Sequence, residues 1–513
     1  MGEESKENTK NQTSPEKIVN MHIDKIKYDL DFLREWTRTR RKEAETRIQE
    51  IKEEMKGDFE SKRKASRKIS IIEGSFNAVT DGAGSRYISP FALALGASNA
   101  QIGLLTAIPN LVGNFSQIAS SWAMEKFSRK KIMFWTTFIQ AFFWLFVILA
   151  GVFFFIFKFD SSVSVNFLIL VYTVLITLGL FCAPIWASWM KDLIDLDKSG
   201  KYFGTRNKII GFIALVSMLA GGFVLDRFTG SKVFIGFFIL FGVCFFARLI
   251  SSALLRKKYE PHLKIEKEHY FSFWQFVKKM AGNNFGRFAI STTLLQLAIN
   301  LATPFFSVYM LQGLGFSYTY YTIVIVSSII GNLLFMPLWG KFADKYGNVA
   351  TMKITAYLTC LVPFGWFASY FFFHGPTTVG LVVYLSGIEF LSGIIFAGFN
   401  LSTSNFIYDA VTREKMGLCT AYDNITSGIG IFIGATLGGF FASNFTFGFM
   451  SVFLALFFVS GVLRVVFSAL FMRNVNEVRM TDDFRFVDIS EKFKDLTPQR
   501  LWERLEVTNF KAE

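Results

Sequence analysis

The sequence predicts an all-α membrane protein of twelve transmembrane helices, arranged as two similar six-helix halves. Apolar residues make up 52% of the 513-residue chain, and phenylalanine alone occurs 62 times. A soluble protein of this length would have a larger share of polar residues, because its surface must be polar. Apolar segments of about 20 residues, the length that crosses a bilayer as a helix, recur along the chain. The same landmarks also return in the same order about 218 residues later.

The internal repeat divides the chain into two homologous halves. Residues 95–98 (Leu-Gly-Ala-Ser) recur as residues 314–317 (Leu-Gly-Phe-Ser), an offset of 219. Further landmarks follow at offsets of 219 to 216: residues 121–130 recur as 340–349; Asp192, Gly200 and Asn207 as Asp409, Gly417 and Asn424; Gly221 and Gly222 as Gly438 and Gly439; and Arg248 as Arg464. A constant order at a nearly constant offset indicates a membrane protein built as a parallel repeat.

Twelve segments are long and apolar enough to be spanning helices. They are residues 70–94, 99–122, 132–157, 163–188, 205–226, 233–255, 286–311, 319–340, 350–373, 378–404, 418–442 and 446–471. The first is the most polar, because it contains Glu73, Asp81 and Arg86, but its residues 89–91 (Ser-Pro-Phe) match residues 303–305 (Thr-Pro-Phe) of an apolar segment. The chain therefore divides into a charged N-terminal tail (1–68), a first half (69–255), a linker (256–285), a second half (286–472) and a C-terminal tail (473–513).

Basic residues concentrate in alternate loops, which predicts the orientation in the membrane. The loops on the side of the N-terminus hold Lys126, Arg129, Lys130 and Lys131; Lys191, Lys198, Lys201, Arg206 and Lys208; Arg256, Lys257, Lys258, Lys264 and Lys267; Lys341 and Lys345; Arg413 and Lys415. The opposite loops hold Lys158, Arg227 and Lys232. We predict a multi-pass protein of the plasma membrane with both termini and the linker in the cytoplasm.

The two tails are predicted to be partly helical. Apolar residues in 23–33 and 48–59 follow three-and-four spacing, which is typical of an amphipathic helix. This helix is either a solvated helix with weak coiled-coil character or a regulatory helix, since residues 38–42 and 62–68 are basic and could lie on anionic lipid. In the C-terminal tail, Thr497 and Pro498 are suited to begin a short helix.

A repeated loop motif connects the sequence to a known family. Residues 340–347 (Gly-Lys-Phe-Ala-Asp-Lys-Tyr-Gly) resemble the Gly-x-x-x-Asp-Arg/Lys-x-Gly signature of the major facilitator superfamily. That signature lies between spans 2 and 3 and again between spans 8 and 9, where both copies fall here. The first copy has Ser121, Glu125 and Ser128 at signature positions and keeps a basic end at Arg129. The resemblance covers roughly residues 70–472 and implies a transporter that works by alternating access around a central cavity.

The motif carboxylates, Glu125 and Asp344, stand at helix ends. There they can accept hydrogen bonds from a neighbouring helix N-terminus or pair with an arginine or lysine across the two halves. The resemblance implies a clasp that exists only while the cytoplasmic side is closed. The alternative is a topology signal, in which the positive charge alone holds the loop inside.

A second repeated block connects spans 4 and 5 and spans 10 and 11. Asp192 and Arg206 in the first copy correspond to Asp409 and Asp423 in the second. The charge reversal between Arg206 and Asp423 could let the two loops pair. Two further cations, Arg248 and Arg464, lie inside the cytoplasmic ends of spans 6 and 12, where they either snorkel or pair with Asp192 and Asp409. We expect this group to be structural or gating.

Ionisable residues near the middle of a span are costly and mark candidate transport sites. Asp81 is a candidate proton carrier, Arg86 an anion-binding group, and Glu389 a second carrier or counter-ion. The alternative is that these groups only satisfy one another and hold the bundle together. Several amides could line the same cavity or form bonds between helices: Asn110, Gln296 and Asn300, with Asn114, Gln117, Gln140 and Asn400.

The sequence lacks the motifs of other function classes. The four cysteines lie in or at the ends of apolar spans, and no cluster has metal-ligand spacing, so we expect neither disulfides nor a metal or other cofactor. No nucleotide motif or catalytic constellation is present, which disfavours an ATP-driven pump and an enzyme. The expected function is secondary active transport of a small solute, coupled to H+ or another ion, with membrane lipid and no nucleic acid as partner. A non-transporting receptor or scaffold of the same fold is the alternative.

Overall fold

The computed structural model describes residues 59–194, 196–261, 272–373, 379–412, 415–448 and 450–482. The chain forms two compact units, residues 1–65 and residues 66–513, and the helical bundle lies in the second. The predicted helices of residues 23–33 and of the C-terminal tail lie outside the described residues. The boundaries predicted for tails, halves and linker stay predictions.

The described residues form helices and no strand, which confirms the predicted all-α fold. The helices of the first half are α3 (Phe59–Ala83), α4 (Ile88–Ala94), α5 (Asn99–Ser116), α6 (Ile118–Lys126), α7 (Arg129–Gly151), α8 (Ser161–Leu193), α9 (Leu196–Arg227) and α10 (Val233–Lys257). The short α11 (Phe273–Lys279) follows in the linker. The helices of the second half are α12 (Asn284–Val308), α13 (Tyr318–Tyr346), α14 (Asn348–Leu358), α15 (Leu361–Phe372), α16 (Val379–Ala410), α17 (Met416–Asn444) and α18 (Val452–Leu470).

Ten helical segments of the described chain are long and apolar enough to cross a membrane, and they correspond to the last ten predicted spans. The first two predicted spans are interrupted helices. The first changes direction after Ala83, where Gly84 packs against Trp144 and Cys244, and continues as α4. The second stops at Ser116 and continues as the short α6. Glycine lowers the cost of such a break because it has no Cβ.

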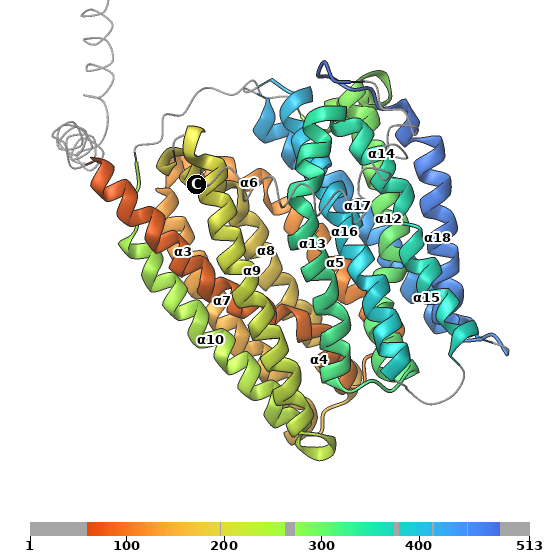
Figure 1. The fold of residues 1–513 in the computed structure, drawn as a ribbon. Coiled ribbons are helices and arrows are strands. Elements are labelled where there is room, and N and C mark those ends of the chain that lie inside the picture. Colours follow the sequence, from red (N-terminus) through yellow and green to blue (C-terminus); the bar gives the residue numbers. More distant parts are fainter. Residues whose placement is uncertain are drawn as a thin grey trace, which may run out of the picture. The chain divides into compact units, whose positions relative to one another are not determined.

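The two halves meet mainly where α5 packs on α17 and where α9 packs on α13. Figure 1 shows both pairs, with α10 of the first half in contact with α7 and with α9. Small residues allow this close approach. Gly103 of α5 lies against the backbone of α17 at Ala435, and Gly439 of α17 against α5 at Ala100.

A stripe of glycines brings α17 close to α12 within the second half. Gly430, Gly434 and Gly438 follow one another at four-residue spacing, which places them on one helix face. Each lies against a backbone carbonyl of α12, so that a Cβ at any of them would clash. Gly221 and Gly222 of α9 likewise lie against Tyr87 and Thr322. Both glycine pairs of the repeat therefore lie where chain segments pack closely.

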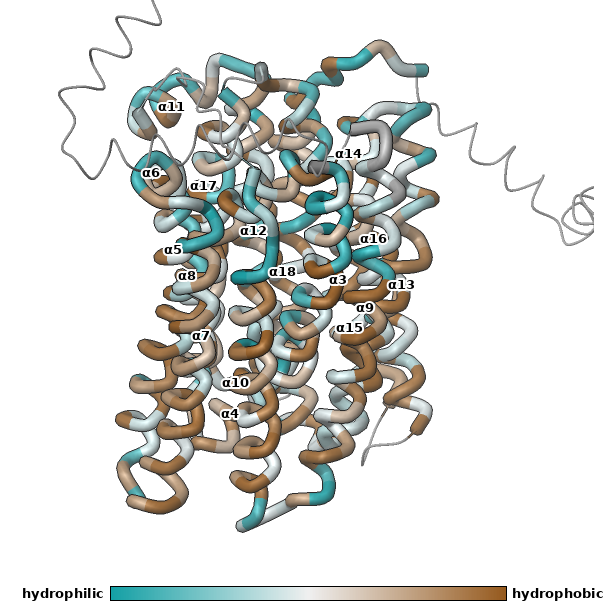
Figure 2. The backbone as a smooth tube through the Cα atoms, turned by 90° about the vertical axis from the view of Figure 1, so that its left-hand side faces the viewer, coloured by the Kyte–Doolittle hydropathy of each residue, from teal (hydrophilic) through white to brown (hydrophobic). Residues whose placement is uncertain are grey.

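Hydropathy separates the middle of the bundle from its ends. Figure 2 shows apolar residues along the middle of the long helices and hydrophilic residues gathered where α6, α11 and α14 lie. We call that end, where α10 ends and α12 begins, the linker end, and the opposite end, where α5 and α13 begin, the distal end. Large apolar side chains such as Leu170 and Phe246 are exposed on the outer faces of the helices, as expected where lipid covers them.

Candidate functional site

A cavity of about 420 Å³ lies between α5 of the first half and α12, α16 and α17 of the second. We call it the central cavity. The following residues line it: Asn110, Asn114, Thr292, Gln296, Phe399, Asn400, Thr403, Ser404, Ile407, Tyr408, Thr420, Asp423, Asn424, Ser427 and Ile431. On each helix these positions recur every three or four residues, so each helix turns one polar stripe toward the cavity.

The lining is rich in amides and hydroxyls and contains a single carboxylate, that of Asp423. The Asp423 side chain is 8% exposed and accepts a hydrogen bond from Thr292 Oγ1 at 3.4 Å. Amides both donate and accept hydrogen bonds, while an ionised carboxylate only accepts them and attracts cations. The lining is therefore suited to a solute with polar groups or a positive charge.

A chain of amides organises the wall shared by α5 and α17. Gln117 Nε2 donates to Asn114 Oδ1 at 3.0 Å, and Asn424 Nδ2 donates to Gln117 Oε1 at 2.8 Å. On α12, Asn300 donates to the Gln296 carbonyl at 2.9 Å. Asn110 and Gln296 thus line the central cavity, whereas Asn300 supports one of the residues that do.

Hydrogen bonds between the halves close the distal end. The Asp226 carboxylate of α9 accepts from the backbone amides of Tyr318 and Thr319, both at 2.8 Å. An acidic side chain is favourable there because the N-terminus of α13 carries unpaired amides and partial positive charge. The Tyr87 hydroxyl lies 2.7 Å from Thr322 Oγ1, and Tyr321 Oη donates to the Arg86 carbonyl at 3.1 Å.

At the linker end of the first half, Arg129 is the centre of an ionic network. Its guanidinium is fully buried and binds Asp192 Oδ2 at 2.7 Å, Ser188 Oγ at 3.1 Å and the Pro261 carbonyl at 2.8 Å. Glu260 lies 3.6 Å from Arg129 Nε and accepts from the Arg129 backbone amide at 2.7 Å. The network joins the ends of α7, α8 and α10.

The second half has a similar network, in which a neutral amide takes the place of the buried guanidinium. Asn348, at the position of Arg129 in the repeat, donates to Asp409 Oδ2 at 2.6 Å. Glu477 accepts from the Val349 backbone amide at 2.7 Å, and the partly exposed Arg479 lies 3.4 Å from Asp409. A glycine precedes Asn348 because the backbone there has a φ of +92°, which L side chains rarely adopt.

The pairings considered for the second repeated block are not the contacts that the structure shows for these arginines. Arg206 stacks over the Trp186 ring at 4.5 Å instead of meeting Asp423. Arg248 donates to Asn77 Oδ1 at 2.6 Å and to Gln140. Both guanidinium groups have aromatic or polar partners within the first half, and these partners take the place of the carboxylates.

Arg464 does not pair with Asp409 either. It is buried and donates to the Thr359 and Ile299 carbonyls at 2.8 and 3.4 Å. Of the motif carboxylates, Glu125 and Asp344 are exposed at the linker end. The ion pairs described there are Arg129 with Asp192 and with Glu260, Lys345 with Asp482, and Arg479 with Asp409. Each joins a residue of one half to the same half or to the segment that directly follows it.

The ionisable residues expected in the cavity lie elsewhere. Asp81 and Arg86 form an ion pair of 3.6 Å across the break after α3, and both side chains are about half exposed. Glu389 is buried and accepts from Trp366 Nε1 at 2.9 Å, on the side of α16 that meets α15. None of the three lines the central cavity.

Two groups of site residues were missed from the sequence. Glu73 is buried in α3 and accepts from Ser251 Oγ at 2.9 Å, although the sequence marked it only as a residue that weakened a span. Glu260 and Glu477 were also missed. They are 217 residues apart, the offset of the second repeated block, so extending the repeat past the last span of each half would have found them.

The described residues contain neither a cluster of metal ligands nor a disulfide. No group of three or more His, Cys, Asp or Glu side chains lies together there in a way that could hold a metal ion. The four cysteines are free thiols, three of them buried.

Comparison with known proteins identifies the family. A sequence model of the Major Facilitator Superfamily matches the chain twice, over residues 75–287 and 288–502. The chain belongs to the Major Facilitator Superfamily. The resemblance inferred from the loop motif is thereby confirmed, and each match covers most of one of the two predicted halves. This superfamily member has the fold of multi-pass membrane transporters.

The curated relatives of this superfamily member include drug exporters. It is 31% identical over 178 residues to the multi-drug resistance efflux pump PmrA of Streptococcus pneumoniae, a match that covers 33% of this chain and 41% of the pump. It is 23% identical over 266 residues to the multidrug resistance protein MdtG of Proteus mirabilis, covering 51% and 61% of the two chains. The matches thus span less than two thirds of these relatives.

Solved structures of other superfamily members share the fold. A mutant form of the nucleoside transporter NupG superposes with a TM-score of 0.62 at 15% identity, covering 80% of this chain and all (100%) of that one. A bacterial homologue of the iron transporter ferroportin in an inward-facing state gives 0.61 at 13% identity, covering 80% and 99%. At such identities the likeness concerns the fold alone.

Proposed function

We propose that this protein is a secondary active transporter that moves a small polar or cationic organic solute by alternating access around the central cavity. One observation carries the proposal: a polar cavity with a single carboxylate lies where α5 of one half meets three helices of the other. Hydrogen bonds also join the two halves at the distal end. A solute held there is in contact with both halves and can sense their relative movement.

Asp423 is the proposed coupling group. It is the carboxylate of the lining, and Thr292 is a neutral partner that leaves its charge uncompensated. Such a carboxylate can hold a proton or attract a cationic solute, and the two compete for it. Competition for one site makes entry of one depend on departure of the other.

Export from the cytoplasm is the proposed direction. The lysine and arginine distribution favours cytoplasmic termini and linker, in which case the central cavity faces the cytoplasm in this conformer. Two relatives that are named multidrug efflux or resistance proteins support the same direction. We further propose the plasma membrane as the location.

A second proposed coupling site is the Asp81–Arg86 ion pair. Its 3.6 Å separation and its half-exposed side chains would let solvent protons reach Asp81, and Arg86 could attract an anionic solute. Glu389 is the third proposed carrier, although its bond to Trp366 favours a structural role. These groups compete with Asp423 for the same function, so one experiment can rank them.

The test is flux of a fluorescent organic cation into proteoliposomes, with and without a pH gradient. We expect Asp423→Asn to reduce gradient-driven accumulation at least about 10-fold, because an amide cannot exchange a proton, and to retain solute exchange. Asp81→Asn and Glu389→Gln, measured in parallel, should keep most of the accumulation. Undiminished accumulation by Asp423→Asn would move coupling to whichever variant loses it. Absence of flux under every gradient would favour the receptor or scaffold function.

A further inference from the structure

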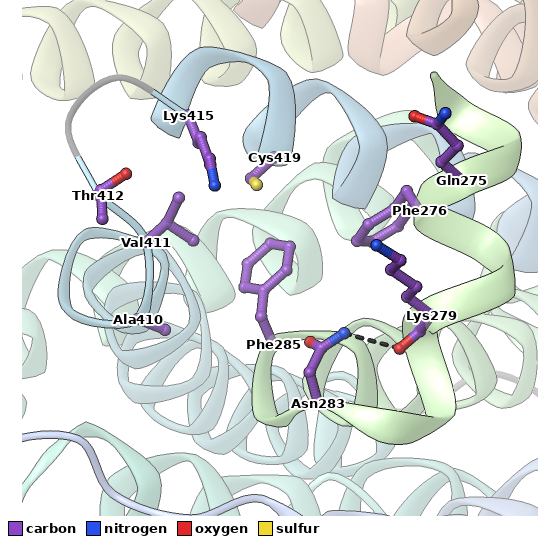
Figure 3. A pocket seen from close by; sticks show the side chains of 10 residues that line it. All are labelled: Gln275, Phe276, Lys279, Asn283, Phe285, Ala410, Val411, Thr412, Lys415 and Cys419. Carbon is purple, nitrogen blue, oxygen red and sulfur yellow. Dashed lines mark hydrogen bonds between the residues drawn. The ribbon is translucent and has the colours of Figure 1, made fainter. Parts of the chain in front are cut away.

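A second cavity, of about 510 Å³, lies at the linker end of the second half. It shares no lining residue with the central cavity. Its walls are α11, the start of α12, the end of α16 and the start of α17, as Figure 3 shows. The lining residues are Gln275, Phe276, Lys279, Asn283, Phe285, Ala410, Val411, Thr412, Lys415 and Cys419. We call it the linker cavity.

Specific contacts hold the walls of the linker cavity in place. Asn283 Nδ2 donates to the Lys279 carbonyl at 2.7 Å, and Asn283 Oδ1 accepts from the Gly286 amide at 2.7 Å, which ties the end of α11 to the start of α12. Gly286 lies against the Met280 backbone, where a Cβ would not fit. The Phe276 ring packs on Phe285 at 5.9 Å between centroids. The cavity is therefore preformed.

The lining combines an apolar floor with two cations. Figure 3 shows Lys279 and Lys415 extending toward the cavity from different walls, with the Phe276 and Phe285 rings beside them. Within the described ranges neither lysine has a carboxylate partner, and amide and hydroxyl groups of Gln275, Asn283 and Thr412 lie in the same lining. This is the chemistry of a site for an anion attached to an apolar body.

The linker cavity lies at the depth of a membrane surface. The membrane-spanning segments Asn284–Gly313, Val379–Ala410 and Met416–Asn444 begin or end at its rim. Trp274 of α11 is 71% exposed, and tryptophan is enriched where a membrane meets water. Basic pockets between helix ends at this depth bind acidic lipid headgroups.

We propose that the linker cavity binds an amphiphilic anion. Its phosphate or carboxylate group bridges Lys279 and Lys415, and its apolar part packs against Phe276 and Phe285. The source is either an acidic phospholipid of the adjacent leaflet or a water-soluble amphiphile. The ligand also braces α17, since Lys415 and Cys419 precede Asp423 on that helix and Phe276 packs on Tyr422 at 5.5 Å.

Native mass spectrometry of the full-length protein in detergent tests the proposal without any transport assay. The probes are dioleoyl phosphatidylglycerol, dioleoyl phosphatidylcholine, octyl phosphate and inorganic phosphate. We expect the acidic lipid to bind more tightly than the zwitterionic one. The double variant Lys279→Gln/Lys415→Gln should weaken that binding about 30-fold. The matched control Lys278→Gln/Lys341→Gln, which removes two charges outside the cavity, should not.

A second variant separates loss of the site from loss of folding. Val411→Trp fills the cavity and leaves its charge unchanged, so it should weaken binding as the double variant does, and each variant must keep the wild-type melting temperature within a few degrees. Binding of octyl phosphate in preference to the lipid, abolished by the same variants, would assign the site to a soluble amphiphile. Equal binding of every anionic probe to wild type, double variant and control would overturn the proposal.

Discussion

At the distal end of the bundle, Asp226 of the first half accepts hydrogen bonds from the first amides of α13 in the second half. At the linker end, by contrast, Asp192 and Asp409 bind partners in their own halves. In a transporter that alternates between conformers, a contact between the halves is made in one conformer and broken in the other. Such a contact changes the ratio of conformers, whereas a contact within one half moves with that half.

The comparison also bears on the clasp that the sequence predicts for the linker end. Glu125 and Asp344 are exposed at the linker end, where the described ion pairs lie within single halves. A clasp across the halves there would belong to a conformer in which the linker end is closed. The role predicted for Asp344 therefore stays a prediction.

The largest effect is expected from Arg129, which holds the linker end of the first half. Arg129→Met leaves the partly exposed carboxylates of Asp192 and Glu260 beside a vacated guanidinium site. Loss of one partner from a fully buried ion pair costs about 3–5 kcal/mol, and that is the upper bound here. We expect a large fall in melting temperature, measured in detergent by tryptophan fluorescence. Asn348→Ala, at the equivalent position of the second half, should cost much less because Asp409 keeps Arg479. Equal losses would contradict the asymmetry between the halves.

Lys258 is buried at the same end of the first half, and its burial predicts that the stability of the fold depends on pH. Its ammonium lies 4.3 Å from the Trp189 ring centroid, and burial lowers the pKa from 10.5 to about 8, partly opposed by Glu73. Between these values the unfolded chain binds the proton and the folded protein does not, so stability should rise with pH from about 8 to 10.5, by about 3 kcal/mol.

The measurement is the melting temperature of Lys258→Met and wild type across that pH range. The variant should lack the rise, whereas Lys257→Met, which changes an exposed neighbour, should keep it. A wild-type protein whose melting temperature is flat or falls between pH 8 and 10.5 would show that Lys258 stays charged in the fold.

At the distal end, a substitution of Asp226 should change the ratio of conformers and leave the stability of the fold unchanged. Asp226→Asn weakens two charge-assisted hydrogen bonds between the halves, and a loss of about 1.4 kcal/mol shifts the conformer ratio about 10-fold. Spin labels at Lys232 and Gln312, one on each half, would report a larger population of long distances. The control is Asp160→Asn, since Asp160 accepts a similar bond from Ser162 inside one half. The same shift in the control would remove the special role of Asp226.

The smallest effect is expected from Arg479. Its side chain is 37% exposed, and exposed ion pairs contribute about 0–1 kcal/mol because water and salt screen them. Arg479→Gln should therefore lower the melting temperature by only a few degrees at most, and less in high salt. A loss as large as that of Arg129→Met would mean that the two linker-end networks are equivalent.

The sequence by itself determined the helices, the two halves and the family. Each depends on information that lies along the chain: runs of apolar residues, a constant offset and a loop motif. Part of the candidate site followed as well, because Asn110 and Gln296 are polar residues inside apolar spans and both line the central cavity.

Only the tertiary structure decided which side chains meet. Asp423 lines the cavity and Glu389 bonds to Trp366, although the sequence suggested a loop role for the first and a transport role for the second. Successive residues turn about 100° around a helix axis, so a small rotation exchanges a cavity-facing position for a buried one. Hydropathy does not specify that rotation when all neighbours are apolar. Packing against other helices specifies it, as where Asp423 meets Thr292 of α12 and Glu389 meets Trp366 of α15.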